Sequence, residues 1–294
     1  NMETLMLNAY DKEDIRRAGE LLRQGGVVAI PTETVYGLAA DATSSTAVER
    51  IFQAKGRPQD NPMIVHIASM EDLPPLVEQV PPAAEKLARL FWPGPLTMIF
   101  RKSGRVPEIV TAGLDTVAVR MPQHPSARAV IEAAQAPLAA PSANRSGKPS
   151  PTEARHVMAD MKGLIEAVVD GGECEVGVES TVVDVTGPVA RVLRPGAVTP
   201  EQIRQALGRV EVDDAVFHKV DESQPVRSPG MKYRHYAPRA PLTLFVGAPD
   251  VTARAIEQEM QPHDAVLCFD EYHDFYDDEK GPVRTYGPSS DKQA

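Results

Sequence analysis

The sequence predicts an α/β protein in which an open, mixed sheet is followed by a second, smaller α/β unit. Hydrophobic patterns with helical spacing alternate with short apolar runs over residues 10–169. The runs Ser180–Val185 and Ala190–Leu193 are joined across a Thr-Gly-Pro turn, which is typical of an antiparallel hairpin and not of another parallel crossover. A new strand–helix–strand pattern begins at Leu242, after a stretch rich in proline. The sheet is therefore expected to be mixed.

The predicted elements of the first domain follow from hydrophobic periodicity and from the residues at their ends. Residues 10–24 place apolar side chains at helical spacing, and two glycines end this helix before the buried strand Val27–Ile30. The same spacing predicts helices at residues 46–54, 81–90 and 127–134. Short apolar runs predict buried strands at residues 63–67, 96–100, 117–119, 138–139 and 167–169.

The domain organisation is expected to have three parts. Residues 8–210 form the first domain, whose last helix starts at a capping box in which Thr199 supplies the N-cap hydroxyl and Gln202 the third helical position. Residues 211–239 lose periodicity and contain several prolines, which predicts an extended linker. Residues 240–294 predict the opening of a doubly wound, Rossmann-like unit, with strands at 242–246 and 265–269, a helix at 251–260 and irregular structure thereafter. We expect this second domain to be incomplete.

Composition argues against several classes of protein. The net charge of −10 and the aromatic content of 5% disfavour a chain whose main task is to bind nucleic acid, because phosphates require clustered cations and single strands require stacking platforms. The two cysteines, Cys174 and Cys268, are far apart, so neither a metal site nor a disulfide framework is expected. No run approaches the ~20 apolar residues of a membrane helix, and a secretory signal pattern is lacking, which favours a cytoplasmic protein without a membrane partner.

Two hydroxyl-rich loops directly follow predicted strands, where ligands bind in α/β sheets. Residues 31–38 read Pro-Thr-Glu-Thr-Val-Tyr-Gly-Leu, and the threonines could contact a ligand or bond their own backbone. Residues 141–147 contain small donors that could surround an anion, or they form an ordinary turn. Neither G-x-x-x-x-G-K-[ST] nor G-x-G-x-x-G occurs, which excludes a P-loop or a Rossmann phosphate site.

Charged and titratable residues near these loops allow two interpretations each. Lys55 and Arg57 could hold a triphosphate, or they could complement the negative end of the preceding helix, an effect of ~0.3–1 kcal/mol. His66 lies in an apolar strand, where a histidine is more often a hydrogen-bonded core residue than a ligand contact. Arg120 ends a buried strand and needs an anionic partner, either a structural carboxylate or a ligand carboxylate.

Taken together and in this order, the segments resemble the YrdC family over residues 10–205. The Lys-x-Arg signature of the family stands here as Lys55-Gly56-Arg57, the Ser-x-Asn signature as Ser142-Ala143-Asn144, and the opening motif at residues 31–38 is intact. Residues 228–238 are similar to the connector of the two-domain threonylcarbamoyl-AMP synthases in this family. The chain is thus identified as a member of the longer type.

The resemblance implies a twisted, open YrdC-like sheet with a locally positive cleft, crossed by the linker. It implies an L-threonylcarbamoyladenylate synthase, a nucleotidyltransferase that condenses L-threonine, bicarbonate and ATP to threonylcarbamoyl-AMP and pyrophosphate, with Mg²⁺ on the nucleotide. A separate tRNA threonylcarbamoyl transferase complex would use this product to form threonylcarbamoyladenosine next to the anticodon.

The resemblance also implies roles for individual residues. By motif, the residues that would bind threonine are Thr34, His66, Arg120, Ala140 through its backbone, and Ser180. The residues that would bind ATP are Lys55, Arg57, Asn61, Thr116, Ser142, Asn144, Ser150, Arg194 and, from the linker, Tyr233. Lys55 and Arg57 would be catalytic, because cations there would offset the charge that builds on the leaving pyrophosphate.

Two other functions remain as alternatives. A non-catalytic module for double-stranded RNA is one, because members of this fold are associated with such RNA and Lys55, Arg57, Arg145 and Lys148 would make the cleft basic. Carbamoyl transfer in hydrogenase maturation is the other, although that assembly carries zinc-binding cysteine pairs that two isolated cysteines do not provide.

Overall fold

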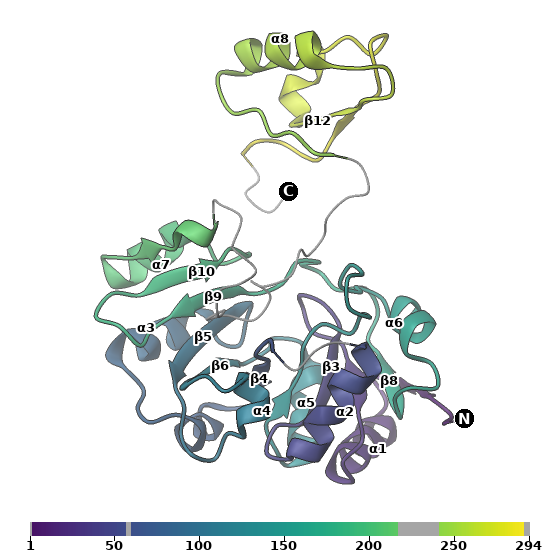
Figure 1. Cartoon of the computed structure of the whole chain (residues 1–294), viewed down its shortest axis with the longest axis vertical. Helices are drawn as coiled ribbons and strands as arrows, with labels where there is room; N and C mark the ends of the chain where they lie inside the picture. The colour runs from purple at the N-terminus through teal and green to yellow at the C-terminus, as the bar shows by residue number, and fades with distance from the viewer. Residues whose placement is uncertain (1, 57–59, 217–240, 291–294) are drawn as a thin grey trace. The chain divides into compact units, whose positions relative to one another are not determined.

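The computed structural model describes residues 2–56, 60–216 and 241–290 (Figure 1). The chain divides into two compact units, Asn1–Tyr236 and Ala237–Ala294. The linker expected at 211–239 lies mostly outside the described residues, so the three-part division stays a prediction. Among the helices of the described ranges, none has the length and apolar character needed to cross a membrane.

A mixed sheet of eleven strands, counted over the described residues, forms the frame of the first unit. In spatial order the strands are β1 (Leu5–Asn8), β8 (Ala167–Asp170), β2 (Val28–Ile30), β3 (Gly37–Asp41), β7 (Leu138–Ala139), β4 (Ile64–His66), β6 (Thr116–Arg120), β5 (Leu96–Arg101), β9 (Thr181–Asp184), β10 (Arg191–Arg194) and β11 (Glu211–Val212). The pairs β4–β6 and β5–β9 are parallel, whereas β5–β6 and β9–β10 are antiparallel. The predicted mixed sheet and its hairpin are confirmed.

Helices pack on both faces of this sheet (Figure 1). On one face, α1 (Lys12–Arg23) and α5 (Pro125–Ala134) pack together and bury one hydrophobic cluster with β1, β2 and β8. On the other face, a larger cluster includes residues of α2 (Ser45–Lys55), α3 (Pro82–Phe91), α4 (Glu108–Thr111), α6 (Ala154–Met161) and α7 (Pro200–Leu207). Short 3₁₀ turns lie at Met70–Asp72, Pro74–Leu76 and Asp214–Val216. The predicted capping box starts α7.

Part of the α1–α5 face carries a separate cluster that consists of strand residues, and this part positions the candidate site. Its members are Ile64, Ile99, Ala118, Val182 and Leu193. Leu138 belongs to the α1–α5 cluster and pairs with His66 across β7 and β4, so the face continues from one cluster to the other. Polar side chains of these strands that point to the same side as the cluster residues therefore also lie on this face.

Five helices and strands described in the first unit were not predicted, namely β1, β3, α4, α6 and β11. The clearest case is β3, whose sequence Gly-Leu-Ala-Ala-Asp contains no β-branched or aromatic residue. It forms a strand because β2 and β7 pair with it on its two edges. Hydrogen bonding to neighbouring strands thus outweighs the low intrinsic strand preference of this sequence.

The second unit confirms one predicted helix and one predicted strand, but the strand expected at 242–246 is wrong. The helix is α8 (Pro249–Glu259), and the strand is β12 (Val266–Cys268). The partner of β12 is the parallel strand β13 (Val283–Thr285), which follows the 3₁₀ turn Asp270–Phe275 in a region expected to be irregular. Within the described residues no strand pairs with 242–246, and Leu242, Leu244 and Val246 are 79%, 84% and 88% exposed. Alternating apolar residues form a strand only where a neighbour supplies hydrogen bonds.

Candidate functional site

One row of paired residues crosses five neighbouring strands on the strand-lined face. His66 of β4 lies opposite Arg120 of β6, and Arg120 lies opposite Thr97 of β5. The row continues through Val182 of β9 to Arg194 of β10. Residues directly opposite each other direct their side chains to the same face of a sheet. The register therefore brings together three residues that the sequence singled out separately, His66, Arg120 and Arg194.

Arg120 is 3% exposed and its guanidinium group contacts three parts of the protein. Its Nε donates to Gly94 O at 3.1 Å, its Nη1 donates to Thr34 Oγ1 at 2.9 Å, and its Nη2 forms an ion pair with Glu33. The Glu33 carboxylate, which is 6% exposed, also accepts a hydrogen bond from the backbone N–H of Gln123. The protein itself thus supplies a carboxylate for Arg120. The sequence reasoning missed Glu33, although it lies within the quoted motif at 31–38.

Arg194 donates two hydrogen bonds to Ser180, and its charge acts on Arg120. Its Nε donates to Ser180 O at 3.0 Å and its Nη2 to Ser180 Oγ at 3.2 Å. Burial lowers the pKa of Arg194 to about 10, while the charge of Glu179 acts in the opposite direction. Burial and the charge of Arg194 lower the pKa of Arg120 to about 9. Both groups remain protonated at neutral pH, and because they repel each other, an anion bound between them would be stabilised.

Backbone hydrogen bonds join the loop at 31–38 to two other loops of the site. Tyr36 N donates to Pro151 O at 2.9 Å, and Ala143 N donates to Tyr36 O at 2.8 Å. Gly177 N donates to Thr34 O at 3.0 Å. The loops that carry Thr34, Ser142 and Ser180 are therefore joined to one another, and two of them contact the strand row, through the bonds of Thr34 with Arg120 and of Ser180 with Arg194.

Lys55 holds the loop that contains Ser142 and Asn144. It ends α2, is 2% exposed, and its Nζ donates to Ser142 O and, at 2.7 Å, to Asn144 O. The Asn144 amide group donates to Arg145 O and Lys148 O at 2.9 and 2.7 Å. Its buried Oδ1 has no hydrogen-bond partner within the described part of the chain, so it can accept a bond from a ligand.

The other residues predicted to bind ATP are spread more widely over the first unit and the linker. Ser150 donates a 2.6 Å hydrogen bond to Glu179 Oε1, which places it near Arg194. Asn61 is 1% exposed just before β4. Thr116 starts β6 on the same face as Arg120, but the two are four positions apart, which is about 13 Å along a strand. Arg57 and Tyr233 lie outside the described residues.

The predicted threonine contact at Ala140 is a backbone position. Its N–H donates to Ile64 O at 3.0 Å, and the residue is 5% exposed. Across the described ranges, no group of three or more His, Cys, Asp or Glu side chains could hold a metal ion.

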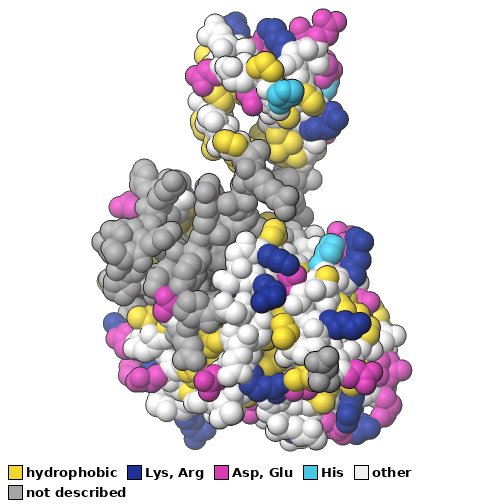
Figure 2. Space-filling model, turned by 45° about the vertical axis from the view of Figure 1, so that its right-hand side comes forward, with side chains coloured by type: hydrophobic (Ala, Val, Ile, Leu, Met, Phe, Trp, Pro, Cys, Tyr) yellow, Lys and Arg dark blue, Asp and Glu magenta, His cyan; other side chains and the backbone are white. Residues whose placement is uncertain are grey.

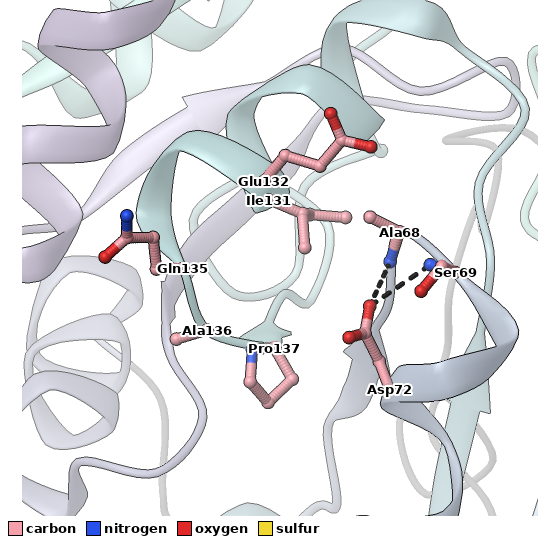
Figure 3. A pocket seen from close by; sticks show the side chains of 8 residues that line it. All are labelled: Ala68, Ser69, Asp72, Ile131, Glu132, Gln135, Ala136 and Pro137. Atoms are coloured by element: carbon pink, nitrogen blue, oxygen red, sulfur yellow. Dashed lines mark hydrogen bonds between the residues drawn. The ribbon is translucent and has the colours of Figure 1, made fainter.

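A cavity of about 330 Å³ lies elsewhere, beside the end of α5 (Figure 3). Its lining residues are Ala68, Ser69, Asp72, Ile131, Glu132, Gln135, Ala136 and Pro137. The Asp72 carboxylate accepts hydrogen bonds from the backbone N–H groups of Ala68 and Ser69. None of the residues predicted for the site lines this cavity.

The charged side chains of the first unit are mixed on the face that Figure 2 shows. Lys and Arg side chains, in dark blue, are interspersed there with Asp and Glu side chains, in magenta. Lys148, one of the cations invoked for RNA binding, forms an ion pair with Asp160. This mixture is unlike the clustered cations that nucleic-acid binding requires.

His66 is expected to make stability depend on pH. Burial lowers its pKa to about 4, while a hydrogen-bond contact of 3.1 Å between Nδ1 and Ile64 O acts in the opposite direction. Above pH 6.5 the imidazole of His66 is neutral in both the folded and the unfolded protein. As the pH falls towards 4, the imidazole becomes protonated in the unfolded protein but stays neutral in the folded one. The folded state should lose about 3 kcal/mol of stability relative to His66→Gln between pH 7 and pH 4. Urea unfolding of both proteins across this range measures the difference, and parallel pH curves would contradict the assignment.

Comparisons with known proteins identify the family of the chain. A family model for Sua5, YciO and YrdC proteins, described as "Telomere recombination", matches residues 20–196. A second model, described as "Threonylcarbamoyl-AMP synthase, C-terminal domain", matches residues 198–293. The threonylcarbamoyl-AMP synthase of Pyrococcus abyssi is 50% identical over 258 residues, which are 87% of this chain and 75% of the relative. The enzyme of the same name from Bacillus subtilis is 49% identical over 248 residues, 84% of this chain and 71% of the relative.

Solved structures give the same result. The crystal structure of P. abyssi Sua5 complexed with L-threonine matches with a TM-score of 0.83 and 45% identity, covering 98% of this chain and 84% of that one. Escherichia coli YciO is 22% identical with a TM-score of 0.60, covering 69% of this chain and 98% of that one, and it shows the shared fold alone. The resemblance to the YrdC family is confirmed. Because the first family model covers more than half of the chain and the second follows it in order, this chain belongs to the Sua5/YciO/YrdC family, in its two-domain form.

Proposed function

We propose that this chain is an L-threonylcarbamoyladenylate synthase, an ATP-using enzyme that condenses L-threonine, bicarbonate and ATP to threonylcarbamoyl-AMP and pyrophosphate. The observation that carries the proposal is the strand row with its loops, in which Arg120, Arg194, Thr34 and Ser180 converge. Relatives at 49–50% identity bear this enzyme's name, and a neighbour at 45% identity was solved with L-threonine. In reaction class, the enzyme would be a nucleotidyltransferase.

The threonine site would lie on the strand row. Ser180 accepts a hydrogen bond from Arg194, so its hydroxyl proton can be directed to an acceptor on the ligand. Thr34 accepts a hydrogen bond from Arg120 and lies 3.0 Å from Thr32 Oγ1, so it would contribute its oxygen to the edge of the site. His66, with its pKa near 4, is neutral at pH 7 and could accept a hydrogen bond from threonine. The backbone at Ala140 would complete the site on the β7 side.

The nucleotide site would lie beside it, over the loop that Lys55 holds. Ser142, Asn144 and Ser150 would contact the nucleotide from this loop region, and Arg194 from β10. Asn61, Thr116 and, by motif, Arg57 and Tyr233 would complete it. Mg²⁺ would be bound through the phosphates and the Glu179 carboxylate, which lies beside Ser150 and near Arg194, since Mg²⁺ typically uses one or two carboxylates with substrate phosphates. When bound, the ion would offset phosphate charge, and Glu179 would hold it.

The chemistry requires that two anions meet. The threonine amine attacks the carbon of bicarbonate, and loss of water gives a carbamate. An oxygen of this carbamate attacks the α-phosphate of ATP while pyrophosphate leaves. Lys55, Arg57 and Arg194 would offset the charge that develops on the phosphates. Holding the reactants together in one site can contribute ~7–11 kcal/mol in well-oriented cases, so positioning would supply much of the rate.

The product would pass to a tRNA threonylcarbamoyl transferase complex in the cytoplasm, where ATP and tRNA are both present. A non-catalytic module for double-stranded RNA is not favoured, because the close relatives bear an enzyme's name and the charges in Figure 2 are mixed.

Pyrophosphate release tests this function directly. Release from ATP and Mg²⁺ is measured with threonine and bicarbonate each omitted in turn, and mass spectrometry identifies the adenylate. We expect release only when both co-substrates are present. Release without threonine, or RNA binding by a folded protein that consumes no ATP, would sink the proposal.

A further inference from the structure

Thr97 lies at the centre of the strand row, yet none of the roles above uses its side chain. It is 0% exposed on β5, and its Oγ1 lies 2.7 Å from Ser180 Oγ. Within the described part of the chain, Ser180 Oγ is the one hydrogen-bond partner of this hydroxyl. A buried hydroxyl proton needs an acceptor, so Thr97 donates this bond and Ser180 accepts it.

Ser180 Oγ accepts a second hydrogen bond, from Arg194 Nη2 at 3.2 Å. The direction of this bond is fixed, because a guanidinium group has donors and no acceptor. A serine oxygen has two acceptor positions and one proton. With both acceptor positions filled by Thr97 and Arg194, Ser180 can only donate to a ligand.

We propose that Thr97 is a positioning residue for threonine, because its hydrogen bond turns the Ser180 proton toward the carboxylate of that substrate. This inference rests on the proposed function. The carboxylate is the acceptor that the surroundings favour, since the guanidinium groups of Arg120 and Arg194 both lie in the row. The ammonium group of threonine has no lone pair and cannot accept a hydrogen bond, so it cannot receive the Ser180 proton.

Two substitutions at Thr97 separate positioning from stability. Thr97→Val keeps the branched shape that suits a buried strand but removes the donor, whereas Thr97→Ser keeps the donor and removes a methyl group. We expect Thr97→Val to weaken threonine binding, measured by calorimetry, by about three- to tenfold, the range of one neutral hydrogen bond. Thr97→Ser should bind threonine as the wild type does and yet melt at a lower temperature than Thr97→Val. If Thr97→Ser, the less stable variant, also bound threonine more weakly than Thr97→Val, the inference would be overturned.

Threoninamide tests which group receives the proton, because it lacks the carboxylate. The preference of the wild type for threonine over threoninamide should fall in Thr97→Val by the same factor as threonine binding. An unchanged preference would overturn the assignment to the carboxylate.

Thr111→Val is the matched control, because Thr111 is also a buried threonine, 1% exposed, and among the described residues its hydroxyl donates only to the backbone oxygen of Glu108. Threonine binding should be unchanged in this variant, and an equal loss there would attribute the Thr97 effect to general loosening. A wild-type protein that binds no threonine would overturn the proposed function; a wild type that binds it while Thr97→Val is unaffected would overturn this inference alone.

Discussion

Replacing Lys55 with methionine is expected to lower threonine-dependent pyrophosphate release by about 100- to 1000-fold, the usual effect of removing one preorganised donor from a reacting site. Methionine keeps an unbranched stem of similar size in this buried position. The Lys55 amino group donates to the carbonyls of Ser142 and Asn144, so its loss frees the loop that would contact the nucleotide. It also removes a cation from the phosphates. Steady-state pyrophosphate release measures the effect.

Lys148→Met is the control for this variant. Lys148 lies in the same loop region, but its side chain is 56% exposed and pairs with Asp160. Because exposed ion pairs contribute ~0–1 kcal/mol, activity should be nearly unchanged. Equal losses in the two variants, or a Lys55 variant with wild-type activity, would contradict the role assigned to Lys55. Circular dichroism confirms that both proteins are folded.

Replacing Glu33 with glutamine is expected to destabilise the fold by about 3–5 kcal/mol, because it leaves the Arg120 charge buried without its carboxylate. Arg120 and Glu33 are 3% and 6% exposed, so water cannot replace the lost partner. Glutamine keeps the size of the side chain and a carbonyl oxygen that can accept the bond from Gln123 N. The free energy of unfolding in urea measures the loss.

Glu166→Gln provides a close match to this change. Glu166 pairs with Arg50 at 2.6 Å and accepts a hydrogen bond from Val27 N at 2.7 Å, so it has the same two kinds of partner as Glu33. The side chains of Arg50 and Glu166 are 29% and 21% exposed, and partial hydration should limit the loss to about 1 kcal/mol. A loss for Glu33→Gln no larger than that for Glu166→Gln would show that burial does not strengthen the Arg120 pair.

Local patterns in the sequence determined most of the elements and most of the candidate residues. The apolar face of residues 10–24 became α1, and the capping box at Thr199 became the start of α7, because both depend on neighbours within one or two helical turns. The motif residues Lys55, Ser142 and Asn144 were found by their order along the chain, and the structure connects them by hydrogen bonds. The strand expected at 242–246 failed because alternation alone supplies no partner strand.

Only the tertiary structure decided which side chains meet. The register of β4, β6, β5, β9 and β10 places His66, Arg120, Thr97 and Arg194 in one row, although they come from positions spread over more than a hundred residues of sequence. Glu33 as the partner of Arg120, and Thr97 as the partner of Ser180, follow from this register and from how the loops pack. Hydrophobic alternation fixes which face a residue occupies, but it carries no information about the strand that lies alongside. The motifs are therefore properties of the sequence, whereas the charge pairing and the hydrogen-bond directions of the site are properties of the fold.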